Sequence, residues 1–323
     1  ELEGPVAIRA VKRFMVDQET TIQTPEVREN ETNAARKVGI VGGGPAGLSC
    51  AYFLARLGYR PVIFEAEPRP GGMLVQTIPA YRLPRETVAR EIRMIEQMGV
   101  EIRTQRRLGS DFTLKSLRDD GYDAVFLGIG VPGGVKLPIE GGDGDGVVDG
   151  ISFLKEYNLR GSVKVGAEVV IVGGGNAATD AARTAVRLGA KVSIVYRRSQ
   201  AEMPAYAEEI EQALEEGVEI HTLTHPVRIV RENDRIVGVE CTRMSLGDFD
   251  RSGRRRAVDS EDSHFQLSAD QVIFAIGQDF DFSSICGGVG LEWDERGRVR
   301  ADRLNGRTSV PWLFAGGDSV TGP

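Results

Sequence analysis

The sequence predicts an α/β fold with two Rossmann-like dinucleotide-binding domains, one inserted within the other. Three observations predict it. An apolar strand runs into a glycine-rich turn and a helix near residue 40, and the same succession recurs 131 positions later. Glycine also makes up 40 of the 323 residues, above the usual share of roughly 7%. Its clusters follow predicted strands, where glycine lets the backbone approach a ligand closely.

The first glycine unit begins at residues 37–47, which read KVGIVGGGPAG. A strand leads into a Gly-x-Gly-x-x-Gly turn and a helix, and the next strand, PVIFE, ends in Glu65. The first glycine allows the turn, the second lets a pyrophosphate touch the backbone, and the third packs helix on strand. The helix N-terminus then offers N–H groups to phosphates. The turn glycines are Gly42, Gly44 and Gly47.

The second unit begins at residues 168–178, which read EVVIVGGGNAA. Its turn positions are Gly173, Gly175 and Ala178. A helix and the strand KVSIVY follow, and both units carry Arg-Leu-Gly at the end of the helix. The two units therefore align without a gap, and Tyr196 falls opposite Glu65, with Arg197 and Arg198 next.

This difference predicts the cofactor of each unit. A carboxylate suits a free ribose 2′-hydroxyl and repels a 2′-phosphate. Two guanidinium groups suit a 2′-phosphate through charge-assisted hydrogen bonds. The first unit is therefore predicted to bind FAD and the second NADP(H). NAD(H) stays open as the alternative, because Arg197 and Arg198 could instead lie on a solvated turn.

The domain boundaries follow from two apolar strands that end in small-residue turns, at 123–130 and 271–278. The whole second unit lies between them, so we expect one domain to be inserted in the other with these strands as hinges. The predicted parts are an N-terminal helix and linker at 1–35, an FAD-binding domain at 36–130 and 279–323, and an NAD(P)H-binding domain at 131–278.

Three further segments have a predicted local structure. Residues 5–19 and 85–98 are expected to be helices, the second amphipathic. The polar stretch 246–265 is expected to be a surface hairpin or loop, with Arg254 to Arg256 solvated.

Composition narrows the class of protein. The net charge of −7 argues against a nucleic-acid partner. No apolar run reaches about 18 residues, and no signal-peptide pattern opens the chain, so we expect no membrane span and a cytoplasmic location.

The three cysteines are far apart and form no CxxC pair, which excludes a near-neighbour redox disulfide and a four-cysteine iron–sulfur site within this chain. The three histidines are scattered. We therefore predict no metal site and no side-chain catalyst.

The two ends suggest an excerpt of a longer polypeptide. The first residue is Glu1, before which an initiator methionine is not normally removed, and the chain stops at Pro323 without an element to close the domain. We expect the C-terminal end of the FAD-binding domain to be truncated.

Nearly the whole chain resembles the small subunit of glutamate synthase and related NADPH-dependent FAD oxidoreductases, which include the flavin half of dihydropyrimidine dehydrogenase. The resemblance is carried by PVAIRAVKRF, VGIVGGGPAGL, GGMLVQTIPAYRLP, VVIVGGGNAATDAARTAVRLGA, VYRRSQAEMPA, EEGVE and FAGGDSV. The YRR followed by EMPA is the most selective of these. Thr77 departs from the family, which usually has glycine there.

Together, the glycine units and the resemblance imply two sets of cofactor contacts. The FAD contacts are expected at Gly42, Gly44, Pro45, Ala46, Gly47, Glu65, Gly72, Met73, Leu74, Arg82, Gly130, Gly317 and Asp318. The NADPH contacts are expected at Gly173, Gly175, Asn176, Ala177, Ala178, Arg197, Arg198 and Gly277.

The resemblance implies an electron-input module. Hydride passes between NADP(H) and FAD, and single electrons pass to or from 4Fe–4S clusters outside this chain, in a missing segment, an iron–sulfur protein or a larger catalytic subunit. Two alternatives stay open: a non-catalytic FAD relay or scaffold subunit, and a flavin monooxygenase. A flavin disulfide reductase is disfavoured, because no paired cysteines follow the first unit. The final acceptor and the direction of electron flow stay open.

Overall fold

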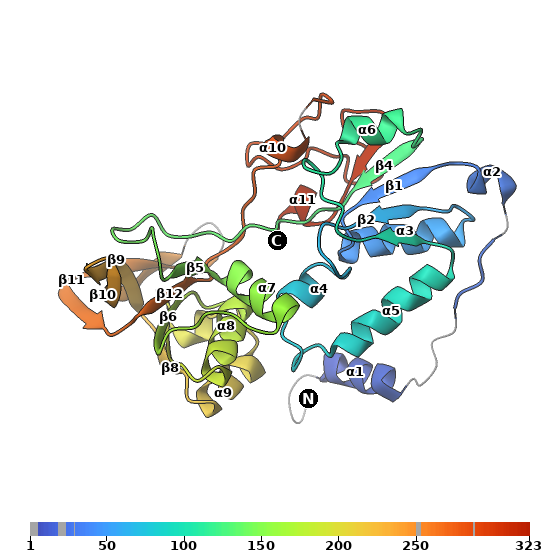
Figure 1. Cartoon of the computed structure of the whole chain (residues 1–323). Coiled ribbons are helices and arrows are strands. Elements are labelled where there is room, and N and C mark those ends of the chain that lie inside the picture. The colour runs from blue at the N-terminus through green and yellow to red at the C-terminus, as the bar shows by residue number, and fades with distance from the viewer. Residues whose placement is uncertain (1–5, 19–23, 29, 250–252, 287) are drawn as a thin grey trace.

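Two parallel five-stranded sheets carry the two glycine units in a computed structural model of the chain (Figure 1). The structure describes residues 6–18, 24–28, 30–249, 253–286 and 288–323. The first sheet has the order β13-β4-β1-β2-β3, and all its pairings are parallel. Its strands are β1 (Val38–Val41), β2 (Val62–Phe64), β3 (Glu101–Arg103), β4 (Ala124–Leu127) and β13 (Leu313–Ala315).

The second sheet repeats this arrangement with the order β5-β12-β6-β7-β8, again parallel throughout. In both sheets the strand before the glycine turn is central, and the next strand of the unit lies beside it. The strands are β5 (Val147–Asp149), β6 (Glu168–Val172), β7 (Lys191–Val195), β8 (Glu219–His221) and β12 (Gln271–Phe274). The predicted fold class, with two Rossmann-like units, is confirmed.

A third, antiparallel sheet packs against the second, with the order β11-β10-β9. Its strands are β9 (Thr224–Glu232), β10 (Arg235–Phe249) and β11 (Arg255–Leu267). The predicted hairpin at 246–265 is confirmed as the far end of β10 and β11, although residues 250–252 lie outside the described part.

The helices complete the two lobes seen in Figure 1. They are α1 (Ile8–Gln18), α2 (Glu31–Ala34), α3 (Pro45–Arg56), α4 (Met73–Gln76), α5 (Arg85–Gln97), α6 (Leu114–Asp119), α7 (Gly150–Arg160), α8 (Asn176–Arg187), α9 (Ala207–Glu215), α10 (Ser283–Cys286) and α11 (Asp318–Thr321). The predicted helices at 5–19 and 85–98 are confirmed as α1 and α5, although Pro5 and Glu19 lie outside the described residues.

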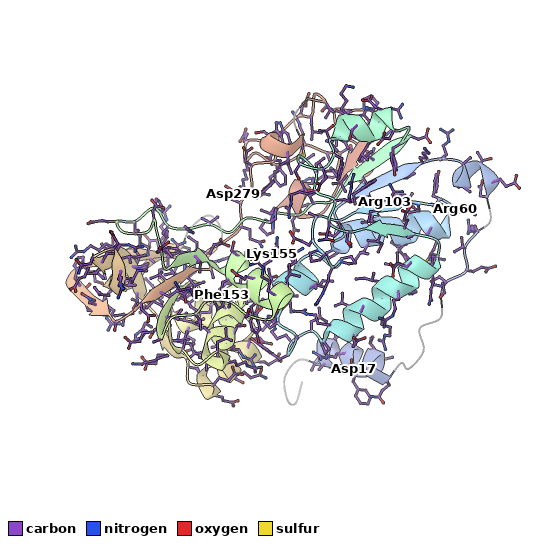
Figure 2. The ribbon with its side chains drawn as sticks, viewed as in Figure 1. Asp17, Arg60, Arg103, Phe153, Lys155 and Asp279 are labelled. Carbon is purple, nitrogen blue, oxygen red and sulfur yellow. The ribbon has the colours of Figure 1, made fainter. Side chains whose placement is uncertain are left out.

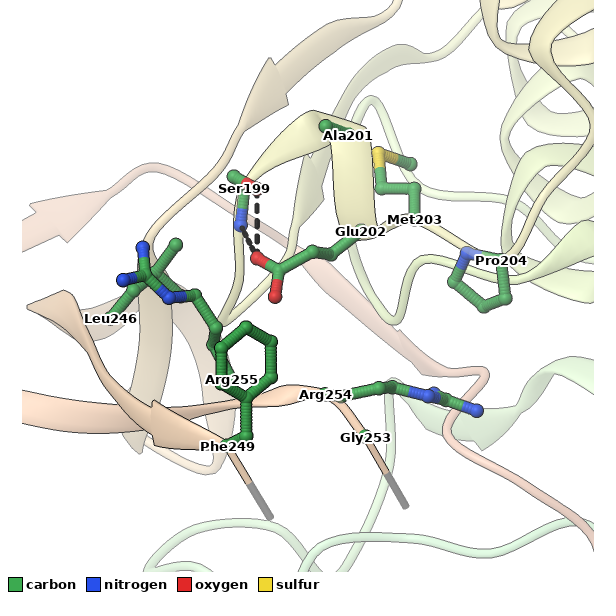
Figure 3. A pocket seen from close by; sticks show the side chains of 10 residues that line it. All are labelled: Ser199, Ala201, Glu202, Met203, Pro204, Leu246, Phe249, Gly253, Arg254 and Arg255. Atoms are coloured by element: carbon green, nitrogen blue, oxygen red, sulfur yellow. Dashed lines mark hydrogen bonds between the residues drawn. The ribbon is translucent and has the colours of Figure 1, made fainter.

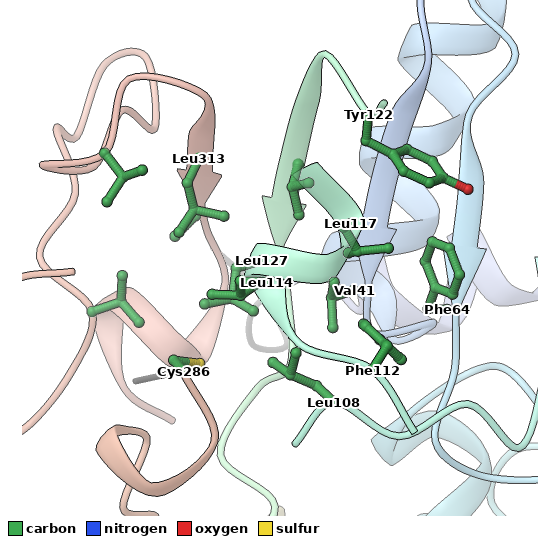
Figure 4. Close-up of a cluster of buried hydrophobic side chains, with 14 residues drawn as sticks. Val41, Phe64, Leu108, Phe112, Leu114, Leu117, Tyr122, Leu127, Cys286 and Leu313 are labelled. Carbon is green, nitrogen blue, oxygen red and sulfur yellow. The ribbon is translucent and has the colours of Figure 1, made fainter. Parts of the chain in front are cut away.

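Each parallel sheet is buried on both faces, which is why its strands read as continuous apolar runs. In the first lobe, one face packs against α3 and α5. The other face forms the cluster in Figure 4, where Phe64, Leu114 and Leu127 lie together with β13. In the second lobe, one face packs against α7 and α8, and the other meets the antiparallel sheet.

The chain crosses between the lobes twice, and the two crossings run side by side. The backbone N–H of Asp279 donates to the Gly133 carbonyl at 3.0 Å, and that of Val135 donates to Gly277 at 3.1 Å. The strand at 123–130 becomes β4 of the first sheet, whereas that at 271–278 becomes β12 of the second. The domain boundaries and the hinge role stay predictions.

The tight contact at Gly47 yields the first prediction. An ideal Cβ on Gly47 would lie 1.9 Å from the Gly42 carbonyl oxygen. We expect Gly47→Ala to lower the free energy of unfolding by about 3 kcal/mol, because the turn must shift. The second unit has a methyl at this position, so Ala178→Gly should cost only about 1 kcal/mol, mainly through helix propensity. Urea denaturation measures both, and equal midpoints for Gly47→Ala and the wild type would contradict the account.

Candidate nucleotide-binding sites

The first glycine turn can be made only by residues without a side chain. Gly42 has a φ of +102°, and an ideal Cβ there would lie 2.5 Å from the Gly128 carbonyl oxygen at the end of β4. Gly44 is the N-cap of α3, and Pro45 occupies its first turn, where a missing N–H costs nothing. The positive end of the α3 dipole therefore points out of the sheet edge, ready for an anion.

Glu65 is fixed beneath this turn. It follows β2, and only 5% of its surface is exposed. Its Oε2 accepts a hydrogen bond from the Gly43 N–H at 2.7 Å, and its Oε1 accepts one from the Glu67 N–H at 2.8 Å. Burial raises the pKa of Glu65, and the two N–H donors oppose that shift. Each oxygen keeps acceptor capacity for a further hydroxyl.

A cavity of about 540 Å³ opens in front of this turn. It brings together the turn, the end of β2, α4, the turn after β4, and the start of α11, which lie far apart in the sequence. The expected FAD residues that line it are Gly42, Gly44, Pro45, Ala46, Glu65, Gly72, Met73, Gly130, Gly317 and Asp318.

Three expected FAD residues lie outside that lining. Gly47 packs against the turn instead, and Leu74 packs into the core on the α3 and α5 side. Arg82 turns away toward the second lobe. Its Nη1 lies 2.6 Å from Asp180 Oδ2, and its Nε lies 3.0 Å from Glu209 Oε1.

Arg82 and Tyr81 thus bind the first lobe to α8 and α9. The guanidinium of Arg187 lies 3.8 Å from the centre of the Tyr81 ring. Arg183 lies over the same ring and pairs with Glu209. These contacts fix how the second glycine unit is oriented toward the first. A contact between Arg82 and FAD stays a prediction.

Sequence reasoning missed several residues of the cavity. Glu67 Oε1 lies 2.7 Å from both Arg107 Nη2 and Lys155 Nζ. Burial acts to raise the pKa of Glu67, but these two hydrogen bonds outweigh it and hold the pKa below its ordinary value. Figure 2 shows Lys155 on α7, at the junction of the lobes. The other missed residues include Arg106, Phe280 and Ile285.

The second glycine turn repeats the geometry of the first. Gly173 has a φ of +143°, and an ideal Cβ there would lie 2.3 Å from the Ala275 carbonyl oxygen, after β12. Gly175 is the N-cap of α8, so Asn176, Ala177 and Ala178 form its first turn. Gly277, also with a φ of +143°, lies just beyond Ala275. The expected glycine-turn residues and Gly277 therefore gather at the carboxyl edge of the second sheet.

The residue that packs beneath this turn is Tyr196, an aromatic residue, whereas the first unit has the carboxylate of Glu65. The Tyr196 ring lies 2.5 Å from an ideal Cβ on Gly174, where the first unit has Glu65 against Gly43. The Tyr196 hydroxyl donates to the Glu202 carbonyl at 2.8 Å. Arg197 is exposed. Arg198 is buried, and its Nε donates to the Arg255 carbonyl at 2.7 Å. The predicted alignment of the two units therefore holds in three dimensions, but the two arginines have different surroundings.

Within the residues that the structure describes, no helix is long and apolar enough to cross a membrane. No group of three or more His, Cys, Asp or Glu side chains in that part of the chain could hold a metal ion.

Residues 36–323 match the model of the pyridine nucleotide-disulphide oxidoreductase family. The chain is 43% identical to the NADP(+)-dependent formate dehydrogenase subunit beta of Moorella thermoacetica, over 99% of this chain and 48% of the relative. It is 36% identical to the glutamate synthase [NADPH] small chain of Escherichia coli, over 99% of this chain and 71% of the relative. The chain spans about half the length of the first curated relatives it matches.

The fold is also similar to that of solved structures. FprA of Mycobacterium tuberculosis, in a complex with NADPH, superimposes with a TM-score of 0.73 at 20% identity. The match covers 89% of this chain and 80% of FprA, which supports the shared fold.

The junction between the lobes predicts a pH dependence of stability. Burial raises the pKa of Asp180 to about 6, against the opposing hydrogen bond and charge of Arg82. An unfolded aspartate has a pKa near 3.9, so the folded protein binds this proton more tightly. The stabilising contribution is full below about pH 4 and is lost as the pH rises through about 6.

We therefore expect the wild type to lose about 1 kcal/mol more free energy of unfolding than Asp180→Asn between about pH 5 and pH 7.5. Denaturant titrations at the two pH values measure this. Asp119→Asn is a matched control, because Asp119 pairs with Lys115 on the exposed surface and should leave the pH dependence unchanged. Parallel curves for wild type and Asp180→Asn would contradict the assignment.

Proposed function

The chain belongs to the pyridine nucleotide-disulphide oxidoreductase family, and we propose that it is the NADPH-dependent flavin module of a larger redox enzyme. In this proposal FAD binds at the first glycine unit and NADP(H) at the second. Hydride passes between the two cofactors, and single electrons are exchanged with iron–sulfur clusters outside this chain. The cofactors supply the redox chemistry, and the protein binds them, orients them and sets their electrostatic surroundings.

One observation carries the proposal: two superimposable glycine turns differ in the residue beneath them. Glu65, with an acceptor oxygen on each side, suits the ribose hydroxyls of FAD. Tyr196 presents no carboxylate, so it does not repel a 2′-phosphate, and exposed Arg197 follows directly. The names of the two relatives, which specify NADP(+) and NADPH, support the same preference.

The first cavity fits FAD by shape and by donor set. Its lining includes Glu65, the N-terminus of α3 and the start of α11. The N-terminus of α3 suits the pyrophosphate. An ideal Cβ on Gly317 would lie 2.8 Å from the Ala46 methyl, so glycine there lets α11 come close to the same phosphate-binding turn. Lys155 and Arg107 hold Glu67 at the rim of the cavity.

Disulfide chemistry is not part of this proposal, although the family name includes it. The three cysteines are free and lie on α3, β10 and α10. Burial raises the pKa of both Cys241 and Cys286 to about 12, which disfavours the reactive thiolate. The relatives are named as a subunit and a small chain, which supports electron exchange with a partner. A cytoplasmic location stays a prediction of the sequence.

The carboxylate at residue 65 provides the test. In Glu65→Gln, one oxygen becomes an NH₂ group that faces a backbone N–H donor, and a ribose acceptor is lost. We expect FAD to bind roughly 10–100-fold more weakly, with a matching loss of NADPH-driven ferricyanide reduction at low FAD. Excess FAD should restore that activity.

The control is Glu101→Gln, whose carboxylate is exposed on β3 beside Arg103 and should not affect FAD binding. Fluorescence titration of the apoprotein with FAD gives the affinity. Unchanged FAD affinity in a folded Glu65→Gln protein would rule out the first site as proposed.

A further inference from the structure

A second groove, of about 550 Å³, lies beside the glycine turn of the second unit. One wall is the segment after β7, and the other is the far end of the β10–β11 hairpin (Figure 3). Its lining residues are Ser199, Ala201, Glu202, Met203, Pro204, Leu246, Phe249, Gly253, Arg254 and Arg255.

The groove lies next to the phosphate-binding turn. The Pro204 ring lies 3.9 Å from an ideal Cβ on Gly175. The N–H of Ala205 donates to the Gly174 carbonyl at 3.1 Å, and that of Tyr206 donates to Asn176 Oδ1 at 3.1 Å. The groove therefore lies beside the turn and past the end of β7, where a Rossmann unit holds the adenosine ribose of its dinucleotide.

The hairpin is tied to this wall by its backbone. Arg198 Nε donates to the Arg255 carbonyl, and the Arg255 backbone N–H donates to Glu202. Glu202 also accepts from Ser199 N–H at 3.2 Å and Ser199 Oγ at 2.8 Å. Arg198 thus acts as a positioning residue, which holds the hairpin over the groove.

The two hairpin arginines of the lining point in different directions. In Figure 3, the Arg255 side chain turns toward Leu246, whereas Arg254 extends along the groove on the side of Pro204. The Arg255 guanidinium lies 5.8 Å from the Phe249 ring centre. Arg254 is therefore the hairpin cation that faces the end of the groove next to the glycine turn.

The groove contains one carboxylate, that of Glu202, as well as arginines. The hydrogen bond from Ser199 lowers the pKa of Glu202, so this lining carboxylate stays ionised and repels a phosphate. Arg254 and Arg255 of the lining carry the opposite charge, and exposed Arg197 follows β7 just before this wall begins. Guanidinium groups are the side chains that best suit a dianionic phosphate.

We propose that Arg254, from the hairpin, is a second contact for the 2′-phosphate of NADP(H), in addition to Arg197. This inference rests on the proposed function, because it assumes a nicotinamide dinucleotide at the second unit. It assigns part of the NADP(H) preference to a residue 57 positions beyond Arg197, because Arg254 immediately precedes β11 of the antiparallel sheet.

The test uses the purified chain and two probes that differ only in one phosphate, adenosine 2′,5′-bisphosphate and 5′-AMP. Calorimetry of wild type, Arg197→Ala and Arg254→Ala gives each affinity. We expect each substitution to weaken the bisphosphate by about 10-fold, the value of one charge-assisted contact, and to change 5′-AMP by less than about twofold. Arg256→Ala is the matched control, because Arg256 is exposed on the same hairpin outside the groove lining.

The possible results distinguish a failure of the Arg254 assignment from a failure of the proposed NADP(H)-binding function. If wild type prefers the bisphosphate and Arg254→Ala keeps the full preference, the role of Arg254 is wrong and the proposed function stands. If wild type shows no preference for the bisphosphate over 5′-AMP, both the role of Arg254 and the proposed NADP(H) site are wrong. If Arg256→Ala loses as much as Arg254→Ala, the effect is general hairpin charge, and the assignment is overturned. Arg254→Gln removes the charge but keeps a long polar side chain, and circular dichroism shows whether each variant is folded. Together they distinguish loss of the contact from loss of the fold.

Discussion

The architecture depends on how closely a glycine backbone can approach the end of the neighbouring strand. An added Cβ would lie 2.5 Å from a carbonyl oxygen at Gly42 and 2.3 Å from one at Gly173. This contact sets the path of each turn, and the turn sets where α3 and α8 begin. The helix dipoles, the cavity and the groove at the two sheet edges all follow from it.

Because the two units share this constraint, the difference between them is informative. The residue after the second strand lies beneath the middle glycine of the turn in both units, as Glu65 in one and Tyr196 in the other. One is a carboxylate that accepts backbone N–H bonds, and the other is an aromatic ring that fills the same space. In the proposed function, this one position separates the cofactor roles of two otherwise equivalent folds.

Local patterns in the sequence predicted the two units, their alignment and the hairpin, because a glycine turn, an apolar strand and a helix are defined by neighbouring residues. The same patterns could not locate Arg82, whose carboxylate partners lie on α8 and α9, or Lys155, which reaches Glu67 from the other lobe. Each of these contacts depends on how separate sheets pack, and no local spacing records that packing. Arg106 and Arg107, which follow β3, could have been placed at the cavity from the sequence, because the ends of neighbouring parallel strands meet at one edge of the sheet.

The central claim is that the two turns hold FAD and NADP(H) within reach of each other. Anaerobic titration of the FAD-loaded chain with NADPH, followed by its visible spectrum, tests this most directly. The account predicts that one equivalent of NADPH bleaches one equivalent of flavin, and that NADH requires a much higher concentration. A bound flavin that stays oxidised with both nucleotides would contradict the account and indicate a relay subunit without a working nicotinamide site.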